Sequence, residues 1–152
     1  MGNIVVERIH RDVRLPEKKH EDDYGYDLHI DNFPEMGDWE VICVRPGECV
    51  VVGTGIRMEL PYGLEFQIRS RSGLARRGLM VANAPATIDA GYRGEIFVIL
   101  RNISGMQIEV SKGMRIAQGV FAKVEVGVTI VEGTVEKETK RGEGGLGSTG
   151  ER

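Results

Sequence analysis

The sequence predicts an all-β fold, with a β-sandwich, jelly roll or barrel as its architecture. Several short segments alternate apolar and polar residues, among them GLEFQIRS at 63–70, GIRMEL at 55–60 and MQIEV at 106–110. A period of two is typical of strands with one buried face. Turn sequences such as RPGE at 45–48 and LPYG at 60–63 separate these segments. Many short strands joined by Gly- and Pro-containing turns indicate this fold class.

Three segments depart from this pattern. The apolar residues of EIFVIL at 95–100 are consecutive, which predicts that both faces of the strand are covered, by a second sheet or by another subunit. SGLARRG at 72–78 is the one segment with helical character, and it offers Ser72 as a cap and Gly78 as a terminator. Beyond residue 132 the alternation gives way to charged and then glycine-rich sequence. We therefore expect a β core over 1–132 and a flexible arm over 133–152.

Composition excludes several classes of protein. The chain has 152 residues, 41% of them hydrophobic, and a formal net charge of -3. This predicts one domain with a real core and no stable binding to long nucleic acid, which normally requires a basic surface. No apolar run is long enough to cross a bilayer, and the N-terminus lacks the pattern of a signal peptide. We expect a cytoplasmic protein in which Cys43 and Cys49 are reduced core residues, without a structural zinc site.

Two segments combine residue types suited to phosphate chemistry. In YGYDLHI at 24–30, Asp27 is either an edge-strand carboxylate in water or a carboxylate that orients water held by a metal. In RSRSGLARRG at 69–78, a guanidinium, a hydroxyl and an exposed backbone precede a short helix. Arginine matches phosphate oxygens and free N–H groups attract them, although solvated arginines on a helix are common. The phosphate-binding candidates here are Arg71, Ser72 and Gly73.

Two further segments point to a nucleotide and a water. In NAPATIDAGYRGEI at 83–96, Asn83 offers a donor and an acceptor for a base edge, and Asp89 lies between Ile88 and Tyr92, which suit the walls of a flat pocket. The alternative is a plain hairpin that turns at Asp89-Ala90-Gly91. In KGMRIAQGVF at 112–121, Gln118 is either a satisfied core amide or a ligand contact.

Together with the C-terminal segment, these segments form five motifs in a recognisable order. They read GYDL (25–28), RSGLA (71–75), TIDAGYRGEI (87–96), GMRIAQ (113–118) and RGEGGLGSTG (141–150). This set closely resembles the trimeric dUTP diphosphatases (dUTPases). The resemblance implies a distorted jelly-roll (β-clip) subunit and a homotrimer with three active sites, each shared between all three chains. It also implies hydrolysis of dUTP to dUMP and pyrophosphate with Mg²⁺.

The resemblance also implies roles for individual residues. Asp89 matches the aspartate that activates the attacking water, and Asn83 matches the residue that reads uracil. Tyr92 matches the tyrosine packed against deoxyribose, and Asp27 matches the aspartate associated with hydrated Mg²⁺. Other substrate contacts are implied along the phosphates, in the hairpin and in the arm: Arg71, Ser72, Gly73, Gln118, Thr87, Ile88, Arg141, Leu146, Gly147, Ser148 and Thr149.

The chain departs from the family pattern at three positions. Ser70 stands where the family often has proline, Met114 where an acidic residue is common, and Leu146 where an aromatic ring usually covers uracil. Leucine covers a base but cannot stack on it as a π-system, so we expect a functional site with a looser lid.

Other functions on this fold stay open from the sequence. A dCTP deaminase or bifunctional enzyme is disfavoured because Tyr92-Arg93-Gly94 replaces the glutamate expected there. A regulatory binding protein is a further alternative, as is a β-module that holds single-stranded nucleic acid, although few aromatics accompany the basic segment.

Overall fold

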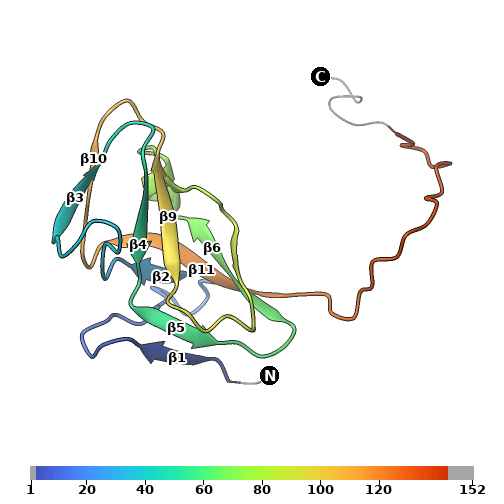
Figure 1. Ribbon diagram of the computed structural model, residues 1–152, viewed down its shortest axis with the longest axis horizontal. Helices are drawn as coiled ribbons and strands as arrows, with labels where there is room; N and C mark the ends of the chain where they lie inside the picture. Colours follow the sequence, from blue (N-terminus) through green and yellow to red (C-terminus); the bar gives the residue numbers. More distant parts are fainter. Residues whose placement is uncertain (1–2, 144–152) are drawn as a thin grey trace.

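The computed structural model describes residues 3–143 and confirms the all-β prediction (Figure 1). The described part contains eleven strands and one short helix, in this order: β1 (Val5–Arg8), β2 (Tyr26–His29), β3 (Val41–Val44), β4 (Cys49–Gly53), β5 (Ile56–Glu59), β6 (Leu64–Ser70), α1 (Ser72–Ala75), β7 (Leu79–Val81), β8 (Ala86–Ile88), β9 (Phe97–Asn102), β10 (Ile108–Ser111) and β11 (Arg115–Lys123).

The strands form four small antiparallel sheets of a jelly-roll-like body. The largest has the order β2-β11-β6-β8, and a three-stranded sheet has the order β4-β9-β7. Strand β1 pairs with β5, and β10 pairs with β3. Neighbouring strands are mostly distant in sequence, so long-range pairing decides which motifs meet.

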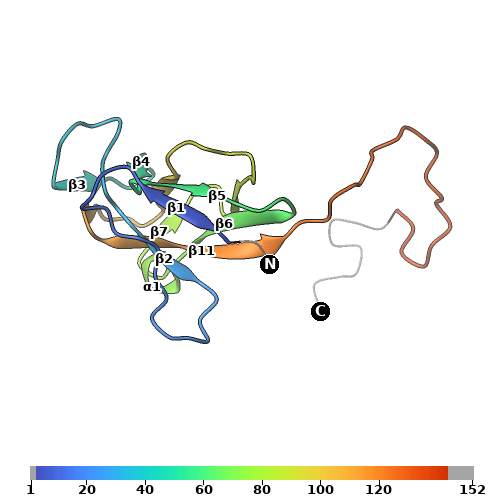
Figure 2. The same ribbon diagram turned by 90° about the horizontal axis from the view of Figure 1, so that it is seen from below.

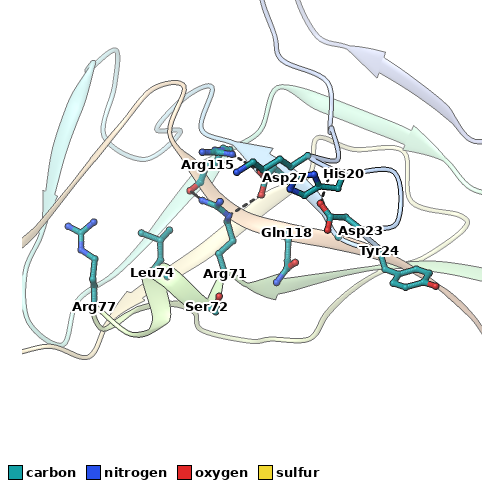
Figure 3. Close-up of a pocket in the computed structure, with 13 residues that line it drawn as sticks. His20, Asp23, Tyr24, Asp27, Arg71, Ser72, Leu74, Arg77, Arg115 and Gln118 are labelled. Atoms are coloured by element: carbon teal, nitrogen blue, oxygen red, sulfur yellow. Dashed lines mark hydrogen bonds and ion pairs between the residues drawn. The ribbon is translucent and has the colours of Figure 1, made fainter.

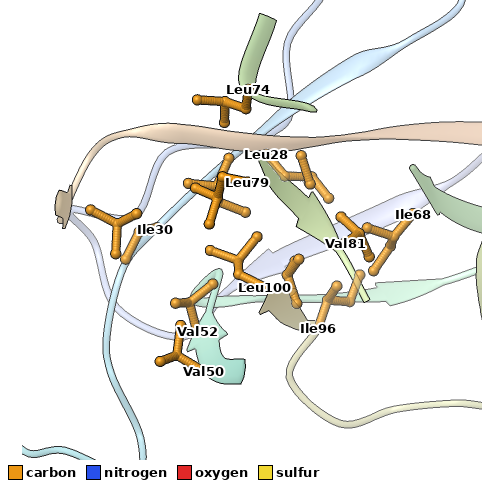
Figure 4. Close-up of a cluster of buried hydrophobic side chains, with 14 of the residues drawn as sticks. Leu28, Ile30, Val50, Val52, Ile68, Leu74, Leu79, Val81, Ile96 and Leu100 are labelled. Carbon is orange, nitrogen blue, oxygen red and sulfur yellow. The ribbon is translucent and has the colours of Figure 1, made fainter. Parts of the chain in front are cut away.

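The core is formed largely by side chains that alternate inward from these sheets (Figure 4). In β6, Phe66 and Ile68 are fully buried, as the alternation predicts. Gly119 of β11 lies directly under the ring of Phe66, and a Cβ atom there would overlap that ring. Further buried residues come from both larger sheets and their connections: Leu28, Ile30, Val50, Val52, Leu74, Leu79, Val81, Ile96 and Leu100.

Within residues 3–143, strand β9 is covered on one face only. Val98, Leu100 and Asn102 point into the core, whereas Phe97 and Ile99 are 40% and 36% exposed. The prediction that a second sheet covers both faces is therefore wrong for the single chain. The alternative, cover by another subunit, is taken up below.

The predicted helix is shorter than expected and is capped differently. Helix α1 spans one turn, and Arg71 rather than Ser72 occupies the N-cap, with no side-chain capping bond. The extended backbone of Arg71 continues β6, and its carbonyl accepts the N–H groups of Leu74 and Ala75. Gly78 ends the following turn at a φ of 90°, where left-handed geometry favours glycine.

Both cysteines carry free thiols, but neither lies in the core. Ile42 and Val44 are the inward residues of β3, so Cys43 faces outward. In β4 the inward residues are Val50 and Val52, which leaves Cys49 outside. Cys43 and Cys49 form no disulfide in the described structure. The predicted burial is wrong because the strand register sets the other residues inward.

Beyond β11 the chain leaves the body as an extended segment (Figures 1 and 2). Apolar side chains alternate along its first part and are exposed: Val124, Val126, Val128 and Ile130. Among the described residues, no helix has the length and apolarity needed to span a membrane.

Candidate active site

Strand β11 brings three of the five motifs together. Its residue Gln118 lies opposite Asp27 of β2 on one side and opposite Arg69 of β6 on the other. The Gln118 Nε2 atom donates a hydrogen bond to the Ser70 carbonyl at 3.0 Å. A Cβ atom on Gly25 would overlap the Gln118 amide oxygen, so the glycine of GYDL permits this close approach. Gln118 is thus positioned by its neighbours, with its amide lining a pocket.

Asp27 lies between two guanidinium groups at this junction (Figure 3). Its Oδ1 atom is 3.0 Å from Arg71 Nε, and its Oδ2 atom accepts a bond from Arg115 Nη1 at 3.1 Å. Arg71 Nη1 in turn donates to the Arg115 carbonyl at 3.0 Å. The Asp27 side chain is only 17% exposed, so it is not an edge carboxylate in bulk water. Arg71 is a predicted phosphate contact, and its guanidinium is already partly engaged, because Nε and Nη1 both contact the protein.

A pocket of about 690 Å³ opens beside this cluster. Its charged lining residues are four permanent cations, Lys19, Arg71, Arg77 and Arg115, against two carboxylates, Asp23 and Asp27. The whole chain has a net charge of -3, so the positive charge is concentrated locally. Such a concentration attracts a polyanion. Ser72 and Gly73 line the same pocket, which places the predicted phosphate contacts together.

A second pocket, of about 210 Å³, is lined by the other group of predicted residues: Thr87, Ile88, Asp89 and Tyr92, with Phe97. The Tyr92 N–H donates to the Asp89 carbonyl at 3.0 Å, and the Tyr92 hydroxyl donates to the Glu95 carbonyl at 2.8 Å. These bonds close the turn that presents Asp89 at the surface. Asn83 is exposed in the preceding turn and does not line this pocket.

The Asp89 segment is not the plain hairpin considered from sequence. Strand β8 before it pairs with β6, whereas β9 after it pairs with β4 and β7. The segment therefore connects two sheets. Glu95 fixes its far end, since its Oε1 atom accepts the Gly55 N–H and the Asn32 amide, each at 2.8 Å.

The two groups of predicted site residues lie far apart within one chain. In the β6–β8 register Phe66 is opposite Ile88, the last residue of β8, so Asp89 follows at the Glu65 end of β6. Arg71 follows the other end of that strand. Six residues at about 3.3 Å each separate the two positions by about 20 Å. At this separation one chain does not bring Asp89 and Arg71 to one phosphate group.

Two departures from the family pattern have local structural roles. The Ser70 hydroxyl accepts the Val81 N–H at 2.9 Å, which ties the end of β6 to β7. Met114 packs against the core, and its carbonyl accepts the Ile30 N–H at 3.0 Å. Leu146, the third departure, lies outside the described residues together with Gly147, Ser148 and Thr149. Arg141 is exposed in the described part of the arm.

Sequence reasoning missed several residues of the cationic pocket. Arg115 stands within the GMRIAQ motif, beside Gln118, and only the strand pairing shows its contact with Asp27. Lys19 and His20 line the pocket from the loop before β2. Their one sequence signal is the short basic run KKH at 18–20.

The described residues suit a magnesium ion that is bound mainly by phosphate oxygens and not by the protein. Within residues 3–143 no group of three or more His, Cys, Asp or Glu side chains is arranged to hold a metal. Both Asp27 oxygens already face guanidinium groups. Mg²⁺ commonly keeps several waters and binds substrate phosphates, so Asp27 suits a contact through water.

Comparison with known proteins decides the family. A family model described as dUTPase matches residues 11–150. The chain belongs to the dUTPase family. A deoxyuridine 5'-triphosphate nucleotidohydrolase of Rickettsia akari is 47% identical over 90% of this chain and 88% of its own. One from Alkaliphilus metalliredigens is 44% identical over 99% of both chains, and one from Picosynechococcus is 43% identical over 94% of this chain and 95% of its own.

Solved dUTPase structures share the fold. The dUTPase of Staphylococcus bacteriophage 80alpha with dUPNHPP superposes with a TM-score of 0.81, at 25% identity and 99% coverage of both chains. A mutant dUTPase from phage phi11 of S. aureus, described as revealing the coordination of a structural Mg(II) ion, has a TM-score of 0.71 at 21% identity, over 91% of this chain and all of its own. The jelly-roll prediction is therefore confirmed.

Proposed function

We propose that this dUTPase-family chain hydrolyses dUTP to dUMP and pyrophosphate. The observation that carries the proposal is the convergence of three motifs on β11, where Asp27, Arg71 and Gln118 line one cationic pocket. Family membership and the names of its relatives support the same substrate. Such an enzyme limits uracil incorporation into DNA and supplies dUMP for thymidylate synthesis. Its two free thiols suit a reducing cytoplasm.

In the proposed reaction, water attacks the α-phosphorus in line with the departing pyrophosphate. Asp89 accepts a proton from this water and aims it, which is the work of a general base. The phosphates are held by Arg71, Ser72, Gly73 and Gln118. The Nε and Nη1 atoms of Arg71 contact the protein, so we assign its phosphate contact to the Nη2 atom. Asp27 would hold Mg²⁺ through water, and the ion would supply positive charge that offsets the charge of the phosphates.

Recognition of the nucleoside falls to the segment 83–92. Asn83 reads uracil through its amide, which offers both a donor and an acceptor. Tyr92 packs against deoxyribose, and its hydroxyl is held by Glu95, so its ring is fixed where a 2'-hydroxyl would clash. Thr87 and Ile88 complete the wall beside Asp89. A base with a different hydrogen-bond pattern leaves polar groups of the site unpaired.

The active sites are proposed to be shared within a homotrimer. Asp89 and Arg71 are about 20 Å apart along β6, so their meeting at one α-phosphate requires two chains. The exposed apolar row of Phe97 and Ile99 offers a surface for a second chain. The segment after β11 offers a second such surface. Its exposed valines alternate as they would in a strand, and this segment pairs with no strand of the described chain.

The arm is proposed to complete each site. In this division the core comprises 1–132 and the arm 133–152. Arg141, Gly147, Ser148 and Thr149 contact the outer phosphates, and Leu146 covers uracil. Glycines allow successive N–H groups to point at phosphate oxygens. Closure excludes water and strengthens the electrostatic interactions inside the site.

A direct assay tests the activity. The purified chain is incubated with dUTP and Mg²⁺, and dUMP and pyrophosphate are quantified; we expect equal amounts of both. Release of ammonia from dCTP would instead support a deaminase, and tight binding of dUTP without turnover would support a regulatory binding protein. Inorganic phosphate in place of pyrophosphate would contradict the proposed point of attack.

A mixing experiment tests the shared site. Asp89→Asn and Arg71→Gln chains are each expected to be nearly inactive alone. Unfolded together and refolded as mixed trimers, they regain about a quarter of the wild-type activity, because about one site in four draws an intact Asp89 and an intact Arg71 from different chains. Mixed trimers as inactive as the parents would place both residues of each site on one chain.

A further inference from the structure

The loop that precedes β2 forms one wall of the cationic pocket and is tied down by its own contacts. The Asp27 N–H donates to the Glu17 carbonyl at 2.8 Å. Lys18 Nζ donates to the Glu21 carbonyl at 2.6 Å and lies 5.8 Å from the centroid of the Tyr26 ring. The Lys18 ammonium therefore makes its hydrogen bond within the loop, and its contact with the Tyr26 ring holds the loop against β2.

A tight turn fixes the middle of the same loop. The His20 N–H donates to Asp23 Oδ2 at 2.9 Å, and the Asp23 N–H donates to the His20 carbonyl at 3.2 Å. Lys19 stands between this turn and the Lys18 contacts, and both Lys19 and His20 line the pocket. Figure 3 shows His20 on the Asp27 side of the pocket. The backbone that carries Lys19 is thus anchored on both sides.

Lys19, like Arg77 at another part of the pocket lining, differs from Arg71 and Arg115 in its partners. Arg71 and Arg115 share the Asp27 carboxylate, and the second carboxylate of the pocket, Asp23, accepts a backbone N–H. Within residues 3–143, the Lys19 side chain makes no hydrogen bond or ion pair. Its ammonium is therefore not held by an ion pair, in a pocket suited to a polyanion.

We propose that Lys19 is a further substrate-binding residue, which contacts the outer phosphates that leave as pyrophosphate. This inference rests on the proposed function. The α-phosphate must stay accessible to Asp89 of another chain, whereas Lys19 lines the same pocket as Asp27, the carboxylate suited to the phosphate-bound metal. A lysine ammonium acts on phosphate as a mobile point charge. It therefore follows the pyrophosphate group without imposing one geometry.

Inhibition by the two products separates this role from a general effect on the loop. Lys19→Gln is expected to raise the KM for dUTP and the inhibition constant for pyrophosphate about three- to fivefold, as for a solvent-exposed ion pair. Its inhibition by dUMP, which lacks the outer phosphates, stays unchanged. Lys19→Arg restores most of the lost affinity. Lys123→Gln, the same charge change at the exposed far end of β11, leaves all three constants unchanged.

Two results would overturn the inference: an unchanged pyrophosphate constant in Lys19→Gln, or an equal rise in the dUMP constant, which would indicate a distorted loop. Titration calorimetry with magnesium pyrophosphate measures the same contact without turnover. If the wild type binds pyrophosphate more tightly than Lys19→Gln but does not hydrolyse dUTP, the Lys19 contact with pyrophosphate is supported and the proposed function fails. If it hydrolyses dUTP and both bind pyrophosphate equally, the function stands and the inference fails.

Discussion

Asp27 and Arg71 form an ion pair across a strand that belongs to neither of them. Asp27 lies on β2 and Arg71 directly follows β6, and both strands pair with β11, which runs between them. The 3.0 Å contact between Asp27 Oδ1 and Arg71 Nε therefore crosses β11, at the end of β6 in the four-stranded sheet. It connects the GYDL and RSGLA motifs before any ligand binds.

This pair has a measurable effect on stability. Asp27→Ala leaves the Arg71 and Arg115 guanidinium groups together without a carboxylate, so we expect the free energy of unfolding to fall by roughly 1–3 kcal/mol. Arg115→Gln retains the Asp27–Arg71 pair, and the half-exposed Arg115 should cost less than about 1 kcal/mol. Urea denaturation at one fixed protein concentration measures both, since oligomer stability depends on concentration. A larger loss for Arg115→Gln would contradict this order.

Asp89 should affect turnover rather than binding. Asp89→Asn keeps the size of the side chain but removes the proton acceptor, and kcat is expected to fall by about 10²–10⁴. Because Asp89 is exposed at its turn, the substitution should leave the fold and nucleotide affinity largely intact. Steady-state kinetics and calorimetry with a non-hydrolysable dUTP analogue check the two parts. Near-normal turnover in the variant would remove Asp89 from the role of base.

The arm should be needed for activity but not for assembly. Deletion of 141–152 is expected to preserve the trimer and remove most of the activity, since the outer phosphates lose their cover. Sedimentation and dUTP hydrolysis measure these effects separately. A fully active truncated protein would overturn the proposed lid.

Leu146 offers a finer test of the same arm. Leu146→Phe supplies the aromatic face that leucine lacks and should lower the KM for dUTP, by stacking on uracil. Leu146→Met, which is similar in size but not aromatic, serves as the control and should leave KM near the wild-type value. An unchanged or raised KM in Leu146→Phe would argue that residue 146 does not lie over the base.

His29 predicts how stability depends on pH. Burial and the nearby Arg14 charge lower the pKa of His29 below its ordinary value. The unfolded chain therefore binds a proton more readily than the folded one, and stability is lost as pH falls from about 6.5 towards the lowered pKa. His29→Leu should flatten this part of the curve of unfolding free energy against pH, whereas the exposed His20→Asn should not. An unchanged curve in His29→Leu would assign the pH dependence to other groups.

The sequence by itself determined the half-buried strands and the chemistry available to the site. The alternation in 63–70 sets Phe66 and Ile68 inward because side chains of a strand point to opposite faces in turn. The five ordered motifs were sufficient to predict the family, since each is local in sequence. The sequence also predicted that the helical segment begins at Ser72. It did not predict the length of the helix or its N-cap, because Arg71 is held by the strand before it.

The tertiary structure decided which of these segments meet. Only the pairing of β11 with β2 and β6 brings Asp27, Arg71, Arg115 and Gln118 together, and only the β6–β8 register separates Asp89 from them. The outward position of Cys43 and the cationic wall of Lys19 likewise depend on packing between distant segments. Local patterns set which face of a strand is apolar, whereas register and strand neighbours follow from burying all these faces at once.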